Sequence, residues 1–353
     1  MSTLHIEHPI SDFTTWKTAF DRFAEIRVQS GVRSHHIQRP VSDPGYIVID
    51  LDFDGPTEAA AFLKFLQEKV WSAQENSPAL AGDLRTAILE PVEKRASAWQ
   101  PDGWDATWRI GVLVPHADVG PEAELHAMAP PEVSIHATRV PFGGIRAGGE
   151  MDPTIPLAPV RAFAEPPNVD DATELLAAAP IHAIAFGFTS SAYVVGRDGE
   201  AAMLERLRTR SRGLPVVAPC ASIAAALAVL GPQRVALFDP PWFDAQLNAL
   251  GAAYYKAAGF DVVSSERCAL PSDQSAIEPT ALFEFVRRHV PAQAETVIFG
   301  GSGFRVAGII DALERELARP VVSPNQALLW AAMRAAGART DAVTRYGRLF
   351  ASL

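Results

Sequence analysis

Short apolar runs alternate with Ala- and Leu-rich segments from Arg109 to the end of the chain. The runs include "RIGVLVP", "IHAIAFGF", "RVALFDP", "TVIFGG" and "RPVVS". Runs of this length, separated by helices of about 10–15 residues, are typical of βαβ units whose strands form a parallel sheet covered on both faces. The pattern predicts an α/β domain over residues 104–353.

Two stretches of this domain repeat one arrangement of a buried strand, a small polar or glycine-rich turn, and a helix. They are "IAFGFTSSAYVVG" (184–196) and "VIFGGSGFRVAGII" (297–310). Such turns present backbone N–H groups to an anion, although Ser, Thr and Gly are also what ordinary helix caps require. Two pseudo-symmetric Rossmann-like lobes that face each other would bring both turns into one cleft, and this favours a carboxylate site. The candidate binding residues are Thr189, Ser190, Gly301, Ser302 and Gly303.

Residues 1–98 show a different pattern, with the order βαββαβ. Phe13, Trp16, Phe20 and Phe23 recur at the spacing of an amphipathic helix. The order predicts a small α+β, ferredoxin-like domain with an antiparallel sheet. Prolines, glycines and polar residues in "KRASAWQPDGWDATW" interrupt both patterns, so the domain boundary is expected near residue 100.

Composition excludes several classes of partner. The chain has 353 residues, 48% of them hydrophobic, and a net charge of −10 without a Lys/Arg run, so neither nucleic acid nor an anionic membrane is an expected partner. No signal-like segment opens the sequence, and a cytoplasmic location is expected. The 2 cysteines lack the spacing of a zinc site, and strand alternation puts His35 and His36 on opposite faces, so no metal is expected.

Four stretches of the second domain carry a family resemblance: "GVLVPHADVGPEAEL", "FGFTSSAYVVG", "VALFDPPWFDAQLNALGAAYYKAAGFDVV" and "GGSGFRVAGIIDALERELARPVVSPNQALLWAAM". They resemble the aspartate/glutamate racemase superfamily, in particular its maleate isomerase and arylmalonate decarboxylase branch. The resemblance implies two lobes around a cleft and cofactor-independent chemistry on small carboxylates by two opposed cysteines. The first domain resembles the antibiotic-biosynthesis-monooxygenase-like dimeric α/β barrels, which implies a homodimer.

Both cysteines of that pattern are absent from this sequence. Their positions correspond to Phe188 and, counting back from "RPVVS", to Gly301. A two-base racemase needs a proton donor on each face of the carbanion, and neither Phe nor Gly can hold that proton. Classical two-cysteine racemisation is therefore disfavoured.

Two residues are candidates to replace the lost chemistry. Cys220 begins a helix after Pro219, where the positive helix terminus favours a thiolate, although most free cysteines are buried packing residues. His116 follows the first strand of the domain, where open α/β sheets bind ligands, although it is also explained as a loop histidine. Asp118, nearby, is interpreted as a helix-start residue.

Three further residues are expected to complete the binding site. Trp242 takes the place of a tyrosine that the resemblance implies, and it suggests a more apolar or aromatic substrate. Arg305 is a candidate bidentate partner for a carboxylate, and Asn325 is placed in the same cleft.

The sequence supports two main hypotheses. The first is a cofactor-independent isomerase or decarboxylase-type lyase that acts on a small (di)carboxylic acid. The second is a non-catalytic carboxylate-binding or scaffold protein that dimerises through its N-terminal domain. A third places oxygenase- or cyclase-like activity in the N-terminal domain, where no defined group of residues supports it.

Overall fold

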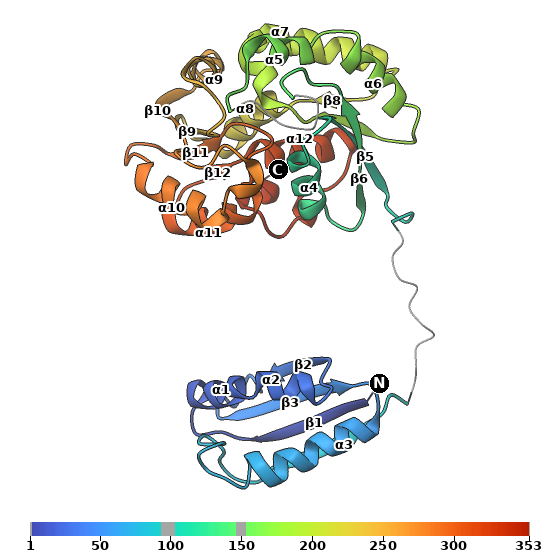
Figure 1. Cartoon of the computed structure of the whole chain (residues 1–353), viewed down its shortest axis with the longest axis vertical. Helices are drawn as coiled ribbons and strands as arrows, with labels where there is room; N and C mark the ends of the chain where they lie inside the picture. Colours follow the sequence, from blue (N-terminus) through green and yellow to red (C-terminus); the bar gives the residue numbers. More distant parts are fainter. Residues whose placement is uncertain (1, 93–102, 146–152, 353) are drawn as a thin grey trace. The chain divides into compact units, whose positions relative to one another are not determined.

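The computed structural model describes residues 2–92, 103–145 and 153–352. Contacts within the chain divide it into two compact units, Met1–Gln100 and Pro101–Leu353 (Figure 1). The domains predicted from the sequence are 1–98 and 104–353, and the boundary expected near residue 100 lies outside the described residues.

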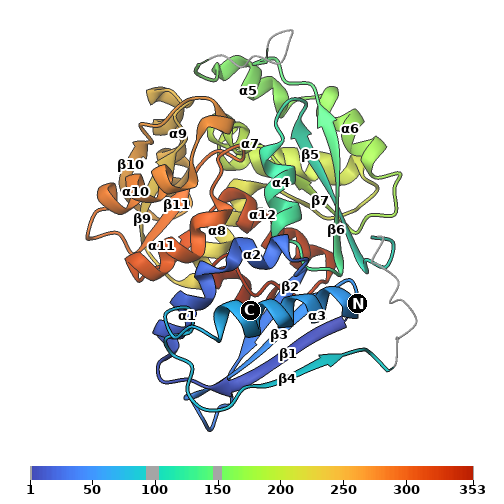
Figure 2. The same cartoon turned by 60° about the horizontal axis from the view of Figure 1, so that its bottom comes forward.

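The first unit is a four-stranded antiparallel sheet with helices packed on one face (Figure 2). In spatial order its strands are β2 (Ser34–Gln38), β3 (Tyr46–Phe53), β1 (Ser2–Pro9) and β4 (Arg85–Leu89). Alternate residues of β1 and β3 are buried, and Trp16 and Phe62 from the helices join the same core. This order is ferredoxin-like, so the predicted α+β fold of this unit is confirmed.

The helices of this unit are α1 (Phe13–Arg22), α2 (Ala24–Gln29) and α3 (Pro56–Phe65), the last continuing as a π-helix over Leu66–Val70. The first helical pattern breaks at Phe23, whose ψ is 15° and whose N–H donates to the Phe20 carbonyl at 3.2 Å. A hydrogen bond that spans only three residues tightens the last turn of a helix and ends it. The single helix predicted from the sequence is therefore two helices, α1 and α2.

The second unit contains two four-stranded parallel sheets with the same strand order, β6-β5-β7-β8 and β10-β9-β11-β12. The strands are β5 (Trp108–Pro115), β6 (Val133–Val140), β7 (Ala183–Phe186), β8 (Val216–Val217), β9 (Arg234–Asp239), β10 (Asp261–Arg267), β11 (Thr296–Phe299) and β12 (Val321–Val322). The repeated order makes the two lobes pseudo-symmetric and confirms the predicted fold class. It also makes β7 and β11 equivalent, so the two predicted turns occupy matching positions.

Helices cover both sheets of the second unit. They are α4 (Gly120–Met128), α5 (Leu157–Phe163), α6 (Asn168–Leu176), α7 (Thr189–Arg210), α8 (Pro219–Leu230), α9 (Ala245–Ala257), α10 (Pro279–His289), α11 (Ile310–Leu317) and α12 (Pro324–Ala336). The last helix, α12, follows the second lobe but packs against β5, β7 and α4 of the first lobe and against α8. Among the described helices, none combines the length and apolarity needed to cross a bilayer.

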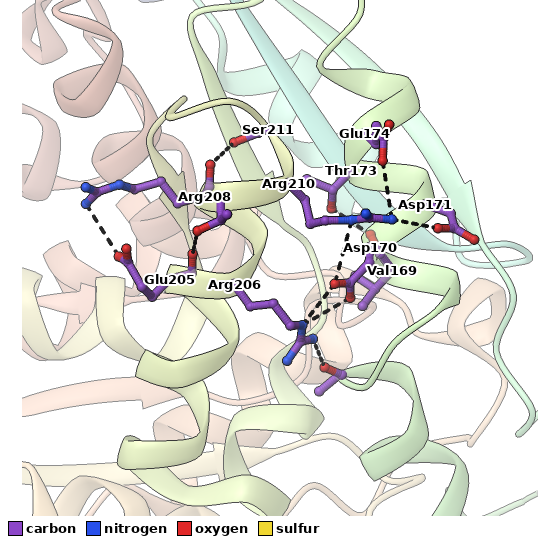
Figure 3. A network of polar contacts seen from close by, with 12 residues as sticks. Val169, Asp170, Asp171, Thr173, Glu174, Glu205, Arg206, Arg208, Arg210 and Ser211 are labelled. Atoms are coloured by element: carbon purple, nitrogen blue, oxygen red, sulfur yellow. Dashed lines mark hydrogen bonds and ion pairs between the residues drawn. The ribbon is translucent and has the colours of Figure 1, made fainter.

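A polar network joins α6 to the second half of α7 (Figure 3). Arg206 Nε donates to both carboxylate oxygens of Asp170 at 3.1 Å, and only 5% of Asp170 is exposed. Arg210 extends the network on the solvent side to Asp171 at 3.0 Å and Glu174 at 3.3 Å.

Asp170→Ala is expected to lower the free energy of unfolding by about 2 kcal/mol, because the partly buried Arg206 guanidinium loses its carboxylate. Asp171→Ala is the matched control on the same helix, since its carboxylate is exposed and should contribute less than about 0.5 kcal/mol. Urea unfolding of the two variants measures the difference. Equal losses of unfolding free energy in the two variants would show that the buried Arg206–Asp170 pair adds no stability beyond that of an exposed pair.

Candidate active site

A cavity of about 670 Å³ lies at the carboxyl ends of β5, β7, β9 and β11. Both predicted turns line it, the first with Phe188 and Ser190 and the second with Gly301, Ser302 and Gly303. The other lining residues are Pro115, Ala117, Asp118, Phe142, Ile145, Pro153, Ile155, Trp242, Phe243, Ser272, Asp273 and Gln274. The structure therefore brings the two turns together in one cavity.

The first turn ends β7 and begins α7 without a side-chain cap. Phe188 is the N-cap residue and makes no capping hydrogen bond, so the first N–H groups of α7 have no side-chain partner there. A helix has no carbonyl partners for its first N–H groups, and these groups attract anions. Ser190 adds a hydroxyl-bearing side chain at the cavity surface.

Glycine is required in the second turn for steric reasons. A Cβ on Gly300 would overlap Asp239 Oδ1, and a Cβ on Gly301 would lie 2.6 Å from Pro240 Cγ. Gly301 also has φ +74°, a conformation that side chains with a Cβ rarely adopt. Gly301 and Gly303 line the cavity, and the conformation of the turn excludes a cysteine at Gly301.

The two turns are joined directly by a buried hydrogen bond of 2.6 Å between Thr189 Oγ1 and Ser302 Oγ. Ser302 O accepts from Asn325 Nδ2 at 2.8 Å, and the same amide donates to Glu124 Oε2 at 2.8 Å. Asn325 is fully buried behind the second turn and does not line the cavity. It supports the turn from behind, which differs from the lining role expected from the sequence.

The wall beside the first turn is aromatic. Phe188 is 5% exposed and packs on Phe163 and Phe142 at ring-centroid distances of 4.5 and 5.0 Å. Trp242 lines the cavity and packs edge-on against Phe304 at 5.8 Å. Phe188 thus borders the cavity without filling it, and the apolar character expected from Trp242 extends over one wall.

His116 lies outside this cavity. Its side chain is exposed and lines a separate cavity of about 560 Å³, together with Phe142 and Phe163. Its Nδ1 accepts a hydrogen bond from the Phe142 N–H at 3.0 Å. The structure does not bring His116 together with the paired turns.

Cys220 is also absent from the cavity lining. It is fully buried in the first turn of α8, with Sγ 3.7 Å from the Thr189 carbonyl behind the first turn. Burial, with a smaller contribution from nearby Glu200, raises the pKa of the thiol well above its ordinary value. The thiolate expected at the helix terminus would need a lowered pKa, so the structure shows the opposite of that expectation. Arg305 is exposed and does not line the cavity either.

Asp118 is a cavity residue that sequence reasoning missed. Its Oδ1 accepts from the Gly120 N–H at 2.9 Å, and its side chain lies beside Gly303 of the second turn. Burial raises the pKa of Asp118 to about 6, while the Gly120 N–H, the Arg139 charge and the Gln274 side chain oppose the shift. A position three residues after the end of β5, at the ligand-binding edge of the sheet, is the signal that could have identified it.

Asp118 is the lining residue best suited to proton transfer. The other lining carboxylate, Asp273, has a lowered pKa because the Ser275 side chain and N–H donate to it. A carboxylic acid that is partly neutral near physiological pH can exchange a proton with a bound molecule.

Within the described ranges, no group of three or more His, Cys, Asp or Glu residues is arranged to hold a metal ion.

Residues 166–350 match the family model described as arylmalonate decarboxylase. Among solved structures, a maleate isomerase from Pseudomonas putida S16 with maleate aligns with a TM-score of 0.61 and 18% identity, covering 69% of this chain and 98% of that one. A Nocardia farcinica maleate cis-trans isomerase with a covalently bound succinylcysteine intermediate aligns with a TM-score of 0.59 and 22% identity, and the alignment covers 69% of this chain and 98% of that one. Arylmalonate decarboxylase aligns with a TM-score of 0.57 and 23% identity, and the alignment covers 69% of this chain and 99% of that one. No curated protein matches the chain. These likenesses support the two-lobed fold.

Proposed function

Because the chain belongs to the arylmalonate decarboxylase family through its match over residues 166–350, we propose that it is a cofactor-independent decarboxylase-type lyase. Its substrate is a small carboxylic acid with an apolar or aromatic substituent. One observation carries the proposal: the two matching turns line a single cavity that also has an aromatic wall. The predicted resemblance of the C-terminal domain to this branch is confirmed by the family match.

The paired turns supply the binding groups. A substrate carboxylate would accept from the N–H groups at the start of α7 and from the open backbone of Gly301–Gly303, with the hydroxyls of Ser190 and Ser302 beside them. Phe188 and Trp242 would contact the substituent. The Thr189–Ser302 hydrogen bond fixes the spacing of the two turns before any ligand binds.

Decarboxylation fits the cavity better than racemisation or thiol-dependent isomerisation. Both Cys220 and Cys268 are buried, and neither lines the cavity. In decarboxylation the bond from carbon to one carboxylate breaks, CO₂ leaves, and the electron pair passes into the remaining carboxyl group as an enediolate. Asp118 then donates its proton to carbon and is reprotonated from water. A single proton donor completes this sequence.

Incubation with phenylmalonate in D₂O, followed by NMR, tests the proposal. We expect release of CO₂ and formation of phenylacetate with one deuterium from solvent at the α-carbon. Malonate, which lacks the aromatic group, should react more slowly, and maleate should remain unchanged. Conversion of maleate to fumarate without reaction of phenylmalonate would contradict the lyase assignment and favour an isomerase.

The second candidate function is a non-catalytic carboxylate-binding protein. The observation that favours it is that Phe188 and Gly301, the positions of the expected cysteines, both border the cavity. This protein would gain thermal stability with phenylacetate yet leave phenylmalonate intact. The NMR assay therefore separates the two functions.

A homodimer formed through the N-terminal unit, as in the monooxygenase-like barrels, and a cytoplasmic location remain predictions. In support of the dimer, one face of the sheet carries side chains that the helices of the unit leave partly exposed, including the His5–Asp50 pair at 2.7 Å. Light scattering of the full chain and of residues 103–353 measures the mass. A dimer that persists without the N-terminal unit would contradict this role.

A further inference from the structure

A buried polar cluster lies directly behind the second turn. Asp239, the last residue of β9, is fully buried, and its carboxyl group accepts from Tyr193 Oη at 3.2 Å and from Asn248 Nδ2 at 2.7 Å. Asn248 also donates to Ser265 Oγ at 2.9 Å. In the described residues, no Lys, Arg or His is bonded to this carboxyl group.

The cluster touches the backbone of the turn. A Cβ on Gly300 would overlap Asp239 Oδ1 and lie 2.8 Å from Tyr193 Oη, so both polar groups pack against the Gly300 main chain. The next residue, Gly301, lines the cavity and contacts Pro240, which follows Asp239 in the chain. A charge on Asp239 therefore acts at short range on the proposed carboxylate site.

Asp239 is the group in this cluster whose charge changes near neutral pH. The titratable groups that interact with it are Tyr193 from α7, Cys220 from α8 and Cys268 after β10, with Tyr255 from α9 beside Cys220, and burial raises the pKa of each of them. These four groups stay neutral. Arg267 pairs with Asp239 in the register of β10 and β9, but its side chain donates to the Phe243 carbonyl. Burial also raises the pKa of Asp239, to about 7. Glu200, a second buried carboxyl with a pKa of about 7, hydrogen-bonds Tyr254 instead.

We propose that Asp239 is a positioning residue that makes carboxylate binding at the second turn depend on pH. With its proton, Asp239 leaves the Gly301–Gly303 backbone able to accept an anion. Without its proton, the buried charge repels that anion. The proposal rests on the function proposed above, since it assumes that the turn binds a carboxylate.

Calorimetric titration with phenylacetate from about pH 5.5 to about pH 8.5 tests the proposal, because this probe stays ionised throughout and is not a decarboxylation substrate. In the wild type, Kd should rise about tenfold for each pH unit above about 7. Asp239→Asn should lack the additional rise near pH 7 and keep the rise in Kd that begins near pH 6, where the cavity-lining Asp118 ionises. The same rise in Asp239→Asn and wild type would overturn the proposal.

Two further variants separate this effect from simple structural damage. Tyr193→Phe removes a hydrogen bond that favours ionised Asp239, so the midpoint of the pH dependence should move upward. Glu200→Gln removes a buried carboxyl of similar pKa that is not packed against the turn, and it should keep the wild-type profile. An unmoved midpoint in Tyr193→Phe, or a Glu200→Gln profile that matches Asp239→Asn, would contradict the role of Asp239. Absence of phenylacetate binding in every protein at every pH would instead overturn the proposed function itself.

Discussion

Asp118→Asn is expected to lower kcat/KM for phenylmalonate by roughly 100-fold or more, because the amide cannot donate the proton that the carbanion needs. Burial raises the pKa of Asp118 to about 6, so the active, protonated form declines as pH rises through that value. Wild-type kcat/KM should therefore fall above about pH 6, and the residual rate of Asp118→Asn should lose this dependence. Rates of CO₂ release across the pH range measure both effects.

His116→Gln is the control for this experiment. His116 follows the same strand as Asp118 but lines a separate cavity, so its replacement should leave kcat/KM within about twofold of wild type. A large loss in His116→Gln with little loss in Asp118→Asn would reverse the assignment and restore the histidine as the proton donor. Because Asn is close to Asp in size, a folding defect is not expected to confuse the comparison.

Gly300→Ala should destabilise the second unit by about 3 kcal/mol or more, because the new methyl group displaces the buried carboxyl of Asp239 from its partners. The Tyr193 hydroxyl and the Asn248 amide would then lose their acceptor inside the core. Thermal and urea unfolding of the full chain measure the loss. Binding of a carboxylate in the cavity should weaken as well, because the next residue, Gly301, lines the cavity.

Gly308→Ala is the matched control for that substitution. Gly308 lies in the same connection between β11 and α11, and an added Cβ would have no neighbour within 4 Å. The alanine should change stability by less than about 1 kcal/mol, with a gain as the expected sign because it restricts the unfolded chain. Similar losses at both positions would show that the fit at Gly300 is unimportant.

The position of the candidate cavity was predictable because it depends on short sequence patterns. Strand, turn and helix residues in "IAFGFTSSAYVVG" and "VIFGGSGFRVAGII" identify the two turns, and pseudo-symmetry brings them together. The proposed proton donor was harder to predict, since His116 and Asp118 are two positions apart after the same strand. The His116 N–H still pairs with the Val140 carbonyl beside β5, whereas the Asp118 N–H turns back to the Pro115 carbonyl. That turn directs the Asp118 side chain to the cavity, and the residue types alone do not reveal the turn.

Cys220 illustrates a different limit of sequence reasoning. A helix N-terminus stabilises a nearby negative charge by about 0.3–1 kcal/mol, but full burial can move a pKa by several units. The sequence reveals the helix terminus through Pro219, while the extent of burial depends on how α7, α8 and α9 pack. Desolvation is therefore the larger effect, and the pKa of the thiol is raised.

The packing of α12 bears on how the chain folds as it is synthesised. This helix is the last long one in the sequence, yet it packs against β5 and β7 of the first lobe. Domains usually fold as units as they emerge from the ribosome, N-terminal parts first. Here the core of the first lobe stays incomplete until residues 324–336 have left the exit tunnel. A nascent chain that stalls after the first lobe would thus expose the apolar surface that α12 covers.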